Sequence, residues 1–331
     1  MKELMITQRE AGQRFDRFLL KYMPEVSPGF LHKMMRKKNI KLNGKKAEGR
    51  EKLREGDRIE IFFSDETLEK FRGRPEKSRR QLTPAQESLR KKVRILYASK
   101  DILVFHKPVG MLTQKAKKED DSLNDYLIDY CVSHKILSPD QLSVFRPSVA
   151  NRLDRNTSGI VLAGISIRGL QELSSMLKKR TIGKYYLCLV EGEVTKDRKI
   201  DGYLTKEEKN NKVTLHKNKV PGASQIQTEI HVVKANPRAS LLKIRLITGK
   251  SHQIRSHLAS VGHPVFGDYK YGNRDFNNRI KWEDGINYQL LHSYELVVPK
   301  GEGVFSGLHI IDPVPEEFLR VQKRWGLEVE E

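Results

Sequence analysis

Residues 151–164 read NRLDRNTSGIVLAG and join a polar turn to a short apolar run. The apolar run, residues 160–163, is bounded by glycine and predicts a buried strand. The polar half holds Asp154. A turn that feeds a core strand keeps its side chains at a fixed place on a rigid scaffold, which suits a catalytic carboxylate. On the spacing alone, an aspartate that only hydrogen-bonds the backbone of its own turn is the commoner case, so the role of Asp154 stays open at this point.

The composition predicts a protein that binds a polyanion. The chain has 331 residues, with 62 Lys and Arg against 42 Asp and Glu, which gives a formal net charge of +20. A charge balance this basic is typical of nucleic-acid binding. A membrane surface is the competing partner. No run of about eighteen apolar residues is present, however, so no membrane-spanning helix is expected.

Two further features favour a cytoplasmic location. The first residues, MKELMITQRE, lack the apolar core of a signal peptide. The two cysteines, Cys131 and Cys188, lie far apart and without metal-ligand spacing. This pattern excludes a disulfide framework and a zinc site, and it is typical of a cytoplasmic protein.

Residues 13–63 are predicted to form a small basic module. Apolar residues at helical spacing indicate two short helices, the second beginning after Ser27, and the Asn-Gly pair at 43–44 is typical of a hairpin turn. Between Pro28 and Arg54, ten Lys or Arg face two Glu. So many uncompensated charges in one small module favour a surface that contacts RNA phosphates. The candidate RNA-binding residues are Lys33, Arg36, Lys37, Lys38 and Lys41.

The rest of the chain is predicted to be a charged linker and one large domain. Residues 64–92 are polar and nearly free of large apolar residues, which indicates a linker with a helical end at 84–92. In residues 93–325, apolar strand-like runs alternate with turns and a few amphipathic helices. This pattern predicts an α+β fold, with a large mixed, mainly antiparallel sheet and flanking helices beside the small N-terminal α/β module. No helix or strand is predicted for the polar residues 273–289.

Two strands of the large domain carry further polar candidates. Lys107 and Pro108 end a predicted strand, a geometry that is expected whatever the function. Tyr186 lies in a predicted strand over residues 183–190. Because side chains alternate along a strand, Tyr185 points to the opposite face, so only one of the two tyrosines can face a substrate.

Residues 248–272 contain a predicted helix with Leu258 on its apolar face and Arg255 off that face, near its start. His252 and His257 invite a metal interpretation. They are five residues apart, which is about 140° around a helix, so they do not share a ligand face. No metal site is expected here.

Together these segments resemble a known family. The string Arg-Leu-Asp-x-x-Thr-Ser-Gly at residues 152–159, followed by an apolar strand, resembles the signature of the RluA-type (RluC- and RluD-like) RNA pseudouridine synthases. The aspartate of that signature is the catalytic residue of the family, which corresponds to Asp154. One position departs from the pattern: the residue before Arg-Leu-Asp is often His in the family and is Asn151 here. The matches cover residues 13–63 and 93–325, nearly the whole chain.

The resemblance also implies roles outside the signature. The Lys-x-Tyr-x-x-x-Val strand at residues 184–190 corresponds to the strand of the active-site tyrosine, whose hydroxyl is a candidate general base. The His-Gln-Ile-Arg string at 252–255 supplies the arginine that pairs with the aspartate. The block GHPVFGDYKYG at 262–272 is expected to form a wall of the site. The implied catalytic residues are Asp154, Tyr186 and Arg255, and the implied substrate-binding residues are Asn151, Arg152, Lys107 and Leu258.

The same resemblance implies the pseudouridine synthase fold, preceded by an S4-like RNA-binding domain at residues 13–63. It implies a monomer that acts on RNA, by family habit large-subunit (23S) ribosomal RNA, without cofactor or metal. The reaction breaks the bond from ribose carbon 1 to base nitrogen 1 and rejoins the uracil through carbon 5, so it needs an ionised carboxylate but no redox step. Covalent attack by Asp154 and abstraction of a ribose proton both stay open. The alternative function is a non-catalytic RNA-binding or ribosome-assembly factor.

Overall fold

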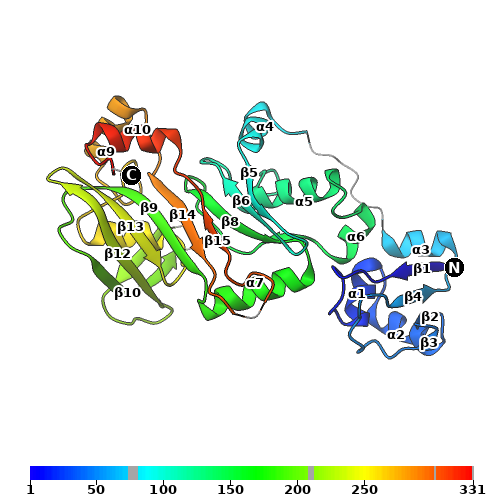
Figure 1. Ribbon diagram of the computed structural model, residues 1–331. Coiled ribbons are helices and arrows are strands. Elements are labelled where there is room, and N and C mark those ends of the chain that lie inside the picture. Colours follow the sequence, from blue (N-terminus) through cyan, green and yellow to red (C-terminus); the bar gives the residue numbers. More distant parts are fainter. Residues whose placement is uncertain (74–80, 208–211, 302, 330–331) are drawn as a thin grey trace.

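The computed structural model describes residues 1–73, 81–207, 212–301 and 303–329. Figure 1 shows a small N-terminal unit beside a larger unit that is built on a long sheet. The two units touch: α6 (Pro139–Val144) packs against α1 (Phe15–Tyr22), and Val144 joins the apolar core of the small unit. The backbone N–H of Ile167 also donates to the carbonyl of Arg9 at 3.1 Å. The units are therefore held together by packing as well as by the chain.

The small unit is a four-stranded antiparallel sheet with three helices, in the strand order β1–β4–β2–β3. Ser27 accepts the N–H of Phe30 and begins α2 directly before Pro28, a favoured helix start. Asn43 and Gly44 have φ of 53° and 72°, which is the backbone of a two-residue hairpin turn. The bounds are β1 (Lys2–Met5), α2 (Pro28–Arg36), β2 (Ile40–Leu42), β3 (Lys45–Lys46), β4 (Arg58–Ile61) and α3 (Asp65–Arg72).

The prediction of a linker at residues 64–92 is wrong over its first part, because α3 belongs to the small unit. Leu68 is buried in the core of that unit, and the ring of Phe71 packs on those of Phe30 and Phe63 with centroids 5.4 and 5.5 Å apart. Two apolar residues in a charged eight-residue helix are too few to reveal it by periodicity. β1 likewise lies before the predicted start of the module at residue 13, so the unit spans residues 2–72.

The large unit is built on one mixed sheet, with the strand order β11–β10–β12–β13–β9–β14–β8–β6–β5. β15 pairs with β14 and β7 with β8. Among the described strands, β8 and β14 pair in parallel, and the other neighbouring strands pair antiparallel. The sheet is therefore mixed but mainly antiparallel. The bounds are β5 (Arg94–Ala98), β6 (Ile102–Lys107), β7 (Ser148–Val149), β8 (Ser158–Gly164), β9 (Gly183–Glu191), β10 (Arg198–Glu207), β11 (Lys212–His216), β12 (Ser224–Asn236), β13 (Ala239–Leu246), β14 (Leu291–Val297) and β15 (His309–Ile311).

Helices cover both faces of this sheet, which explains why β8 is a continuous apolar run. Val161 and Ala163 of β8 join the core cluster that includes Leu127 of α5 and Leu258 of α8, whereas the alternate residues Ile160 and Leu162 join the cluster under α7. The strand is buried along its whole length, as predicted. The helix bounds are α4 (Pro84–Lys91), α5 (Leu123–Ser133), α7 (Ile167–Lys179), α8 (Gln253–Ser260), α9 (Arg274–Asp284) and α10 (Glu316–Arg324).

The polar stretch at residues 273–289, which the sequence left unassigned, contains α9. Ile280 is fully buried, and the ring of Phe276 packs on Phe266 and Trp325 with centroids 5.0 and 5.7 Å apart. These contacts come from distant segments, so the local pattern did not predict the helix. No helix within the described ranges is long and apolar enough to span a membrane.

Glycine at position 159 is required by the pairing of β8 with β14. Gly159 has φ of 113°, and a Cβ atom placed there would lie 2.3 Å from the carbonyl oxygen of Ser293 on β14. Another residue type would be strained by both the backbone conformation and this contact. Gly159 therefore lets β14 approach the beginning of β8, which fixes the polar turn of residues 151–157 at the edge where β8 begins and β6 ends.

Candidate active site

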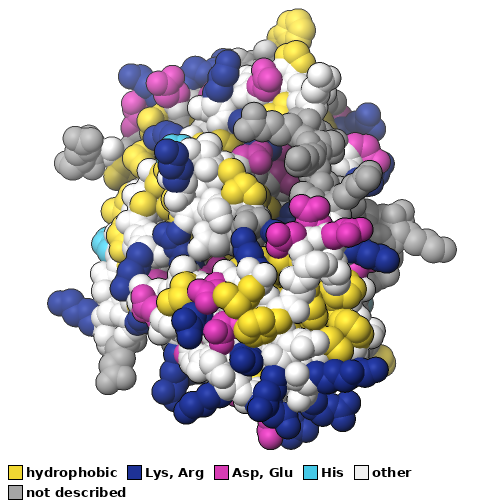
Figure 2. Space-filling model, turned by 90° about the vertical axis from the view of Figure 1, so that its right-hand side faces the viewer, with side chains coloured by type: hydrophobic (Ala, Val, Ile, Leu, Met, Phe, Trp, Pro, Cys, Tyr) yellow, Lys and Arg dark blue, Asp and Glu magenta, His cyan; other side chains and the backbone are white. Residues whose placement is uncertain are grey.

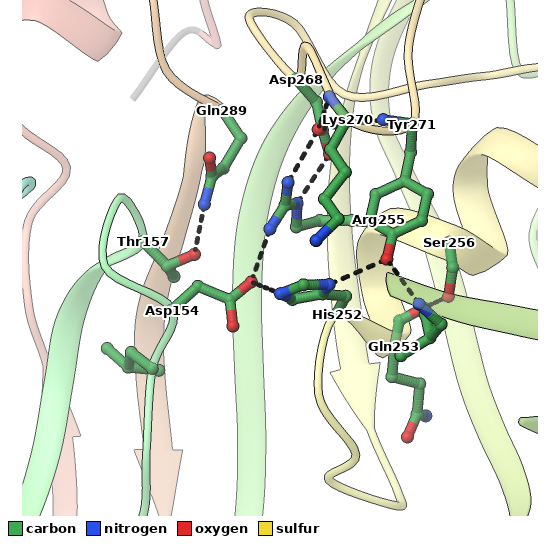
Figure 3. A network of polar contacts seen from close by, with 12 residues as sticks. Asp154, Thr157, His252, Gln253, Arg255, Ser256, Asp268, Lys270, Tyr271 and Gln289 are labelled. Atoms are coloured by element: carbon green, nitrogen blue, oxygen red, sulfur yellow. Dashed lines mark hydrogen bonds and ion pairs between the residues drawn. The ribbon is translucent and has the colours of Figure 1, made fainter. Parts of the chain in front are cut away.

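The turn that carries Asp154 is held by hydrogen bonds from two other segments, the loop with Gly110 and Thr113 and the residue Gln289. Thr113 donates from Oγ1 to the carbonyl of Leu153 at 2.8 Å and accepts the N–H of the same residue at 3.1 Å. Gly110 donates its N–H to the carbonyl of Arg155 at 2.9 Å. On the other side, Gln289 donates to the hydroxyl of Thr157 at 3.2 Å (Figure 3). The backbone at Asp154 is therefore fixed before any substrate arrives.

Lys107 supports this turn from beneath and is not a substrate contact, which corrects the role implied by the resemblance. Its side chain is fully buried, and Nζ donates to the carbonyls of Pro108, Met111 and Arg155 at 2.9, 2.8 and 3.0 Å. Burial lowers the pKa of Lys107 to about 7, against the opposing charge of Asp154. Three carbonyl acceptors need three protons, which only the ammonium form carries, so we assign the charged form. All three donors are used within the protein.

Asp154 meets Arg255, which lies in the first turn of α8, across 101 residues of sequence. Arg255 Nη1 lies 2.8 Å from Asp154 Oδ2. The same guanidinium makes a bidentate contact with the fully buried Asp268, with Nε 2.7 Å from Oδ2 and Nη2 2.8 Å from Oδ1 (Figure 3). Such two-point contacts fix the plane of a guanidinium. Asp268 therefore aims Arg255 at Asp154.

The electrostatics of this group favour a permanent cation beside Asp154. Burial by itself lowers the pKa of Arg255, but the hydrogen bonds and charges of Asp268 and Asp154 outweigh burial and raise the pKa. Arg255 carries one positive charge against two carboxylates, so the three groups together carry one negative charge. Asp154 is the partly exposed member of the three and is the one able to meet a substrate.

Tyr186 lies in the middle of β9, paired with Ser293 of β14, and its hydroxyl hydrogen-bonds Ser293. Its ring is buried in the core cluster that also contains Leu153. Burial, with a smaller effect of the Asp154 charge, raises the pKa of Tyr186 to about 12. The phenol therefore stays protonated at neutral pH, which does not favour it as a general base. Tyr185 points to the other face, where Lys243 Nζ lies 4.9 Å from its ring centroid.

Two of the substrate-binding residues implied by the resemblance instead have structural positions. Leu258 is fully buried in the core beneath α8. Asn151 uses its side-chain amide on β8, because Nδ2 donates to the carbonyl of Ile160 at 3.3 Å and Oδ1 accepts the N–H of Leu162 at 2.7 Å. Arg152, by contrast, is exposed on the turn, and its side chain has no polar partner in the described part of the chain. Of the four, Arg152 alone remains placed to contact a substrate.

The network contains two residues to which the sequence gave no role in chemistry, His252 and Tyr271. His252 Nε2 lies 3.9 Å from Asp154 Oδ2, and its Nδ1 lies 2.8 Å from the hydroxyl of Tyr271 (Figure 3). His257 points elsewhere, toward the hydroxyl of Thr228. Both Asp268 and Tyr271 belong to the block 262–272. In the sequence, the resemblance of this block to the family is the only signal that could have singled them out. Across the described ranges, no group of three or more His, Cys, Asp or Glu side chains could hold a metal ion.

The small unit presents the basic surface that the sequence predicted. Lys33, Arg36, Lys37 and Lys38 are exposed at the end of α2, and none of them has an ion pair within the described residues. Lys41 Nζ lies 4.9 Å from the ring centroid of Phe62. Figure 2 shows Lys and Arg side chains gathered along the lower edge of this face, the side on which α2 and the β2–β3 hairpin lie in Figure 1. Such a surface suits a phosphate backbone.

Comparison with known proteins gives a consistent result. A family model described as RNA pseudouridylate synthase matches residues 101–260. A Mycoplasma genitalium protein named an uncharacterized RNA pseudouridine synthase is 30% identical over 303 residues, which are 91% of this chain and 90% of that protein. The ribosomal large subunit pseudouridine synthase C of Vibrio vulnificus is 29% identical over 296 residues, covering 87% of this chain and 85% of that protein.

Among solved structures, human RNA pseudouridylate synthase domain containing 4 has a TM-score of 0.59 and 18% sequence identity. The alignment covers 75% of this chain and 97% of that one. At this level of identity the likeness concerns the fold alone. It confirms the fold class that was expected from the sequence.

Proposed function

This chain belongs to the RNA pseudouridine synthase family, and from that premise we propose that it converts uridine to pseudouridine in large-subunit ribosomal RNA, with Asp154 as the catalytic carboxylate. The ribosomal substrate is inferred from relatives such as the Vibrio vulnificus protein, whose name states it. The observation that carries the catalytic assignment is the 2.8 Å contact between Asp154 and Arg255, made by the two residues that the signature strings supply.

The reaction needs few groups, and the network around Asp154 supplies the first of them. The bond from ribose carbon 1 to uracil nitrogen 1 breaks, the uracil turns, and a bond forms between ribose carbon 1 and uracil carbon 5, which then loses its proton. Covalent attack and proton abstraction both require an ionised carboxylate beside the ribose. Arg255 provides a fixed positive charge that stabilises this carboxylate in a partly buried site.

We assign Tyr186 to contact with the uracil through its ring rather than to proton transfer. An aromatic face tolerates every orientation of the base as it turns, because the contact is not directional. The hydroxyl is already engaged by Ser293, and the raised pKa keeps it protonated. Arg152, exposed on the same turn as Asp154, is placed to contact a phosphate of the target nucleotide.

We further propose that the small unit is an S4-like module that binds RNA phosphates. Extrusion of the target uridine from its stack costs a few kcal/mol, and phosphate contacts supply binding free energy against that cost. The network around Asp154 is completed by residues of one chain, which supports activity as a monomer. The bacterial relatives named for ribosomal RNA lead us to infer the cytoplasm as its compartment.

Neutralising the basic end of α2 should weaken RNA binding without changing the chemistry. In the triple variant Lys33→Gln/Arg36→Gln/Lys37→Gln we expect the slope of the logarithm of the RNA-binding constant against the logarithm of the salt concentration to fall in magnitude by about 2–3. Each lost phosphate contact means that fewer counterions are released when the RNA binds. The rate of the fully bound complex should stay at the wild-type value. Arg274→Gln/Lys281→Gln/Lys323→Gln, on α9 and α10 at the other end of the molecule, is the matched control and should keep the wild-type slope. An unchanged slope in the α2 variant would exclude this surface.

The proposed function is tested by mapping new pseudouridines after the protein is incubated with unmodified large-subunit RNA, small-subunit RNA and transfer RNA. We expect new pseudouridine in the large-subunit RNA alone. If only transfer RNA were modified, the proposed substrate would be wrong but the proposed reaction would stand. Tight RNA binding with no new pseudouridine in any of the three would favour the alternative, a non-catalytic RNA-binding or assembly factor.

A further inference from the structure

His252 stands at an unusual place for a histidine. It occupies the position before the first residue of α8, where Ser, Thr, Asp or Asn commonly cap the helix. His252 makes no such cap, and its backbone is left-handed, with φ of 54° and ψ of 15°. A side chain that forgoes the cap in a strained conformation is often held for a functional contact. Here the ring is turned between Asp154 and Tyr271 (Figure 3).

The hydrogen bonds of Tyr271 favour one tautomer of His252 over the other. The backbone N–H of Val213 on β11 donates to the hydroxyl of Tyr271 at 3.2 Å. The hydroxyl proton then needs an acceptor, and His252 Nδ1, 2.8 Å away, is the acceptor that the described residues provide. We therefore assign Nδ1 as the acceptor and place the ring proton on Nε2. Burial and the neighbouring Arg255 lower the pKa of His252, against the attraction of Asp154, so the neutral ring fits this assignment.

Tyr271 is itself fixed by the same network. Its backbone N–H donates to Asp268 Oδ1 at 3.3 Å, and the guanidinium carbon of Arg255 lies 5.3 Å from its ring centroid. The ring of His252 meets the ring of Tyr271 edge-on at 5.6 Å. Asp268 thus orients both groups that face Asp154: Arg255 directly, and His252 through Tyr271.

Both donors converge on one oxygen of Asp154. Arg255 Nη1 lies 2.8 Å and His252 Nε2 3.9 Å from Oδ2, whereas Oδ1 has no polar partner among the described residues. At 3.9 Å the N–H of His252 acts through its dipole, and contacts of this kind commonly shorten when a substrate closes the site. Oδ2 is thereby held, and Oδ1 is left as the oxygen that faces the substrate.

We propose that His252 is a positioning residue for the reaction: held with its proton on Nε2 by Tyr271, it fixes Asp154 together with Arg255 so that Oδ1 is presented to the target uridine. This inference rests on the proposed function, because it assigns a role in pseudouridine formation. It also connects strand β11 to the catalytic turn through the chain Val213, Tyr271, His252 and Asp154.

The test compares two replacements of His252 that differ in reach. Asn tolerates the left-handed backbone but is too short to reach Asp154, whereas the amide nitrogen of Gln reaches the place of Nε2. For His252→Asn we expect the single-turnover rate to fall about 10–100-fold, because Asp154 loses the imidazole dipole that helps to hold Oδ2, with unchanged RNA affinity. His252→Gln should stay within about threefold of wild type. Release of tritium from uridine labelled at carbon 5 measures the rate.

A double-mutant cycle with Tyr271→Phe tests the chain of contacts. Removing the hydroxyl of Tyr271 should lower the single-turnover rate of the otherwise wild-type protein. It should not lower the rate of His252→Asn any further, because the hydroxyl acts through the imidazole. Additive effects would overturn the proposal, as would a wild-type rate in His252→Asn or equal losses in the Asn and Gln variants. If the wild-type protein forms no pseudouridine in any RNA, the proposed function fails. If the wild-type protein forms pseudouridine and His252→Asn forms it at the same rate, the proposed function stands and only the role of His252 fails.

Discussion

Asp154→Asn should abolish pseudouridine formation, with a loss of at least about a thousandfold in single-turnover rate, while the protein stays folded and binds RNA as before. The amide has the same shape as the carboxylate but carries no charge, so it can neither attack the ribose nor accept a ribose proton. Arg255 keeps its bidentate contact with Asp268 in this variant, so the walls of the site remain in place. The effect should therefore appear in the rate and not in the RNA affinity.

The matched control is Asp125→Asn on α5. Asp125 has the same side-chain exposure as Asp154, 26%, and also makes an ion pair at 2.8 Å, with Lys115. Both variants remove one carboxylate charge from a comparable ion pair, so any nonspecific effect of charge on RNA binding should be shared. Release of tritium from carbon 5 gives the rate, and RNA titration gives the affinity. Wild-type turnover in Asp154→Asn would end the proposed assignment.

Arg255→Ala should lose both activity and stability, for separable reasons. The activity loss, of about 100-fold or more, follows because Asp154 loses the charge that holds its Oδ2. The free energy of unfolding should fall by about 3–5 kcal/mol, because the fully buried Asp268 is left without its cation. Denaturant unfolding measures the second effect, and the protein should still be folded at 25 °C.

The double variant Arg255→Ala/Asp268→Asn separates these two effects. Neutralising Asp268 removes the stranded buried charge, so most of the lost stability should return. Activity should remain lost, because no cation faces Asp154. If turnover returned together with stability, Arg255 would act only in folding, and its catalytic assignment would have to be withdrawn.

Much of the frame around the site was predictable from local sequence. The apolar run at 160–163 predicted β8, because a strand covered on both faces needs continuous apolar residues. The Asn43-Gly44 pair predicted the hairpin of the small unit. Helices α3 and α9 were missed because each carries too few apolar residues for its periodicity to stand out. Their burial depends on residues outside the helices themselves, which are Phe30 and Phe63 for α3 and Trp325 for α9.

The site itself was predictable only in part. Family resemblance paired Asp154 with Arg255, and these residues do meet. It could not show that Asp268 aims the guanidinium, because that requires knowing that the loop after α8 folds back over it. Lys107 and Leu258 were taken for substrate contacts, whereas the structure buries both. The motif indicates that these two residues matter, and their contacts show what they support: Lys107 bonds the carbonyls beneath the turn, and Leu258 packs in the core.

The parallel pairing of β8 with β14 bears on how the protein is made. The hydroxyl of Ser158, at the head of β8, bonds the imidazole of His292 on β14, 134 residues later. A ribosome that adds about 5–20 residues per second needs roughly 7–27 seconds to produce that stretch. During this interval the newly made turn with Asp154 has no neighbour on that side, and Arg255 also arrives late. Asp154 therefore gains both Arg255 and the pairing of β8 with β14 only after the last third of the chain has emerged and folded.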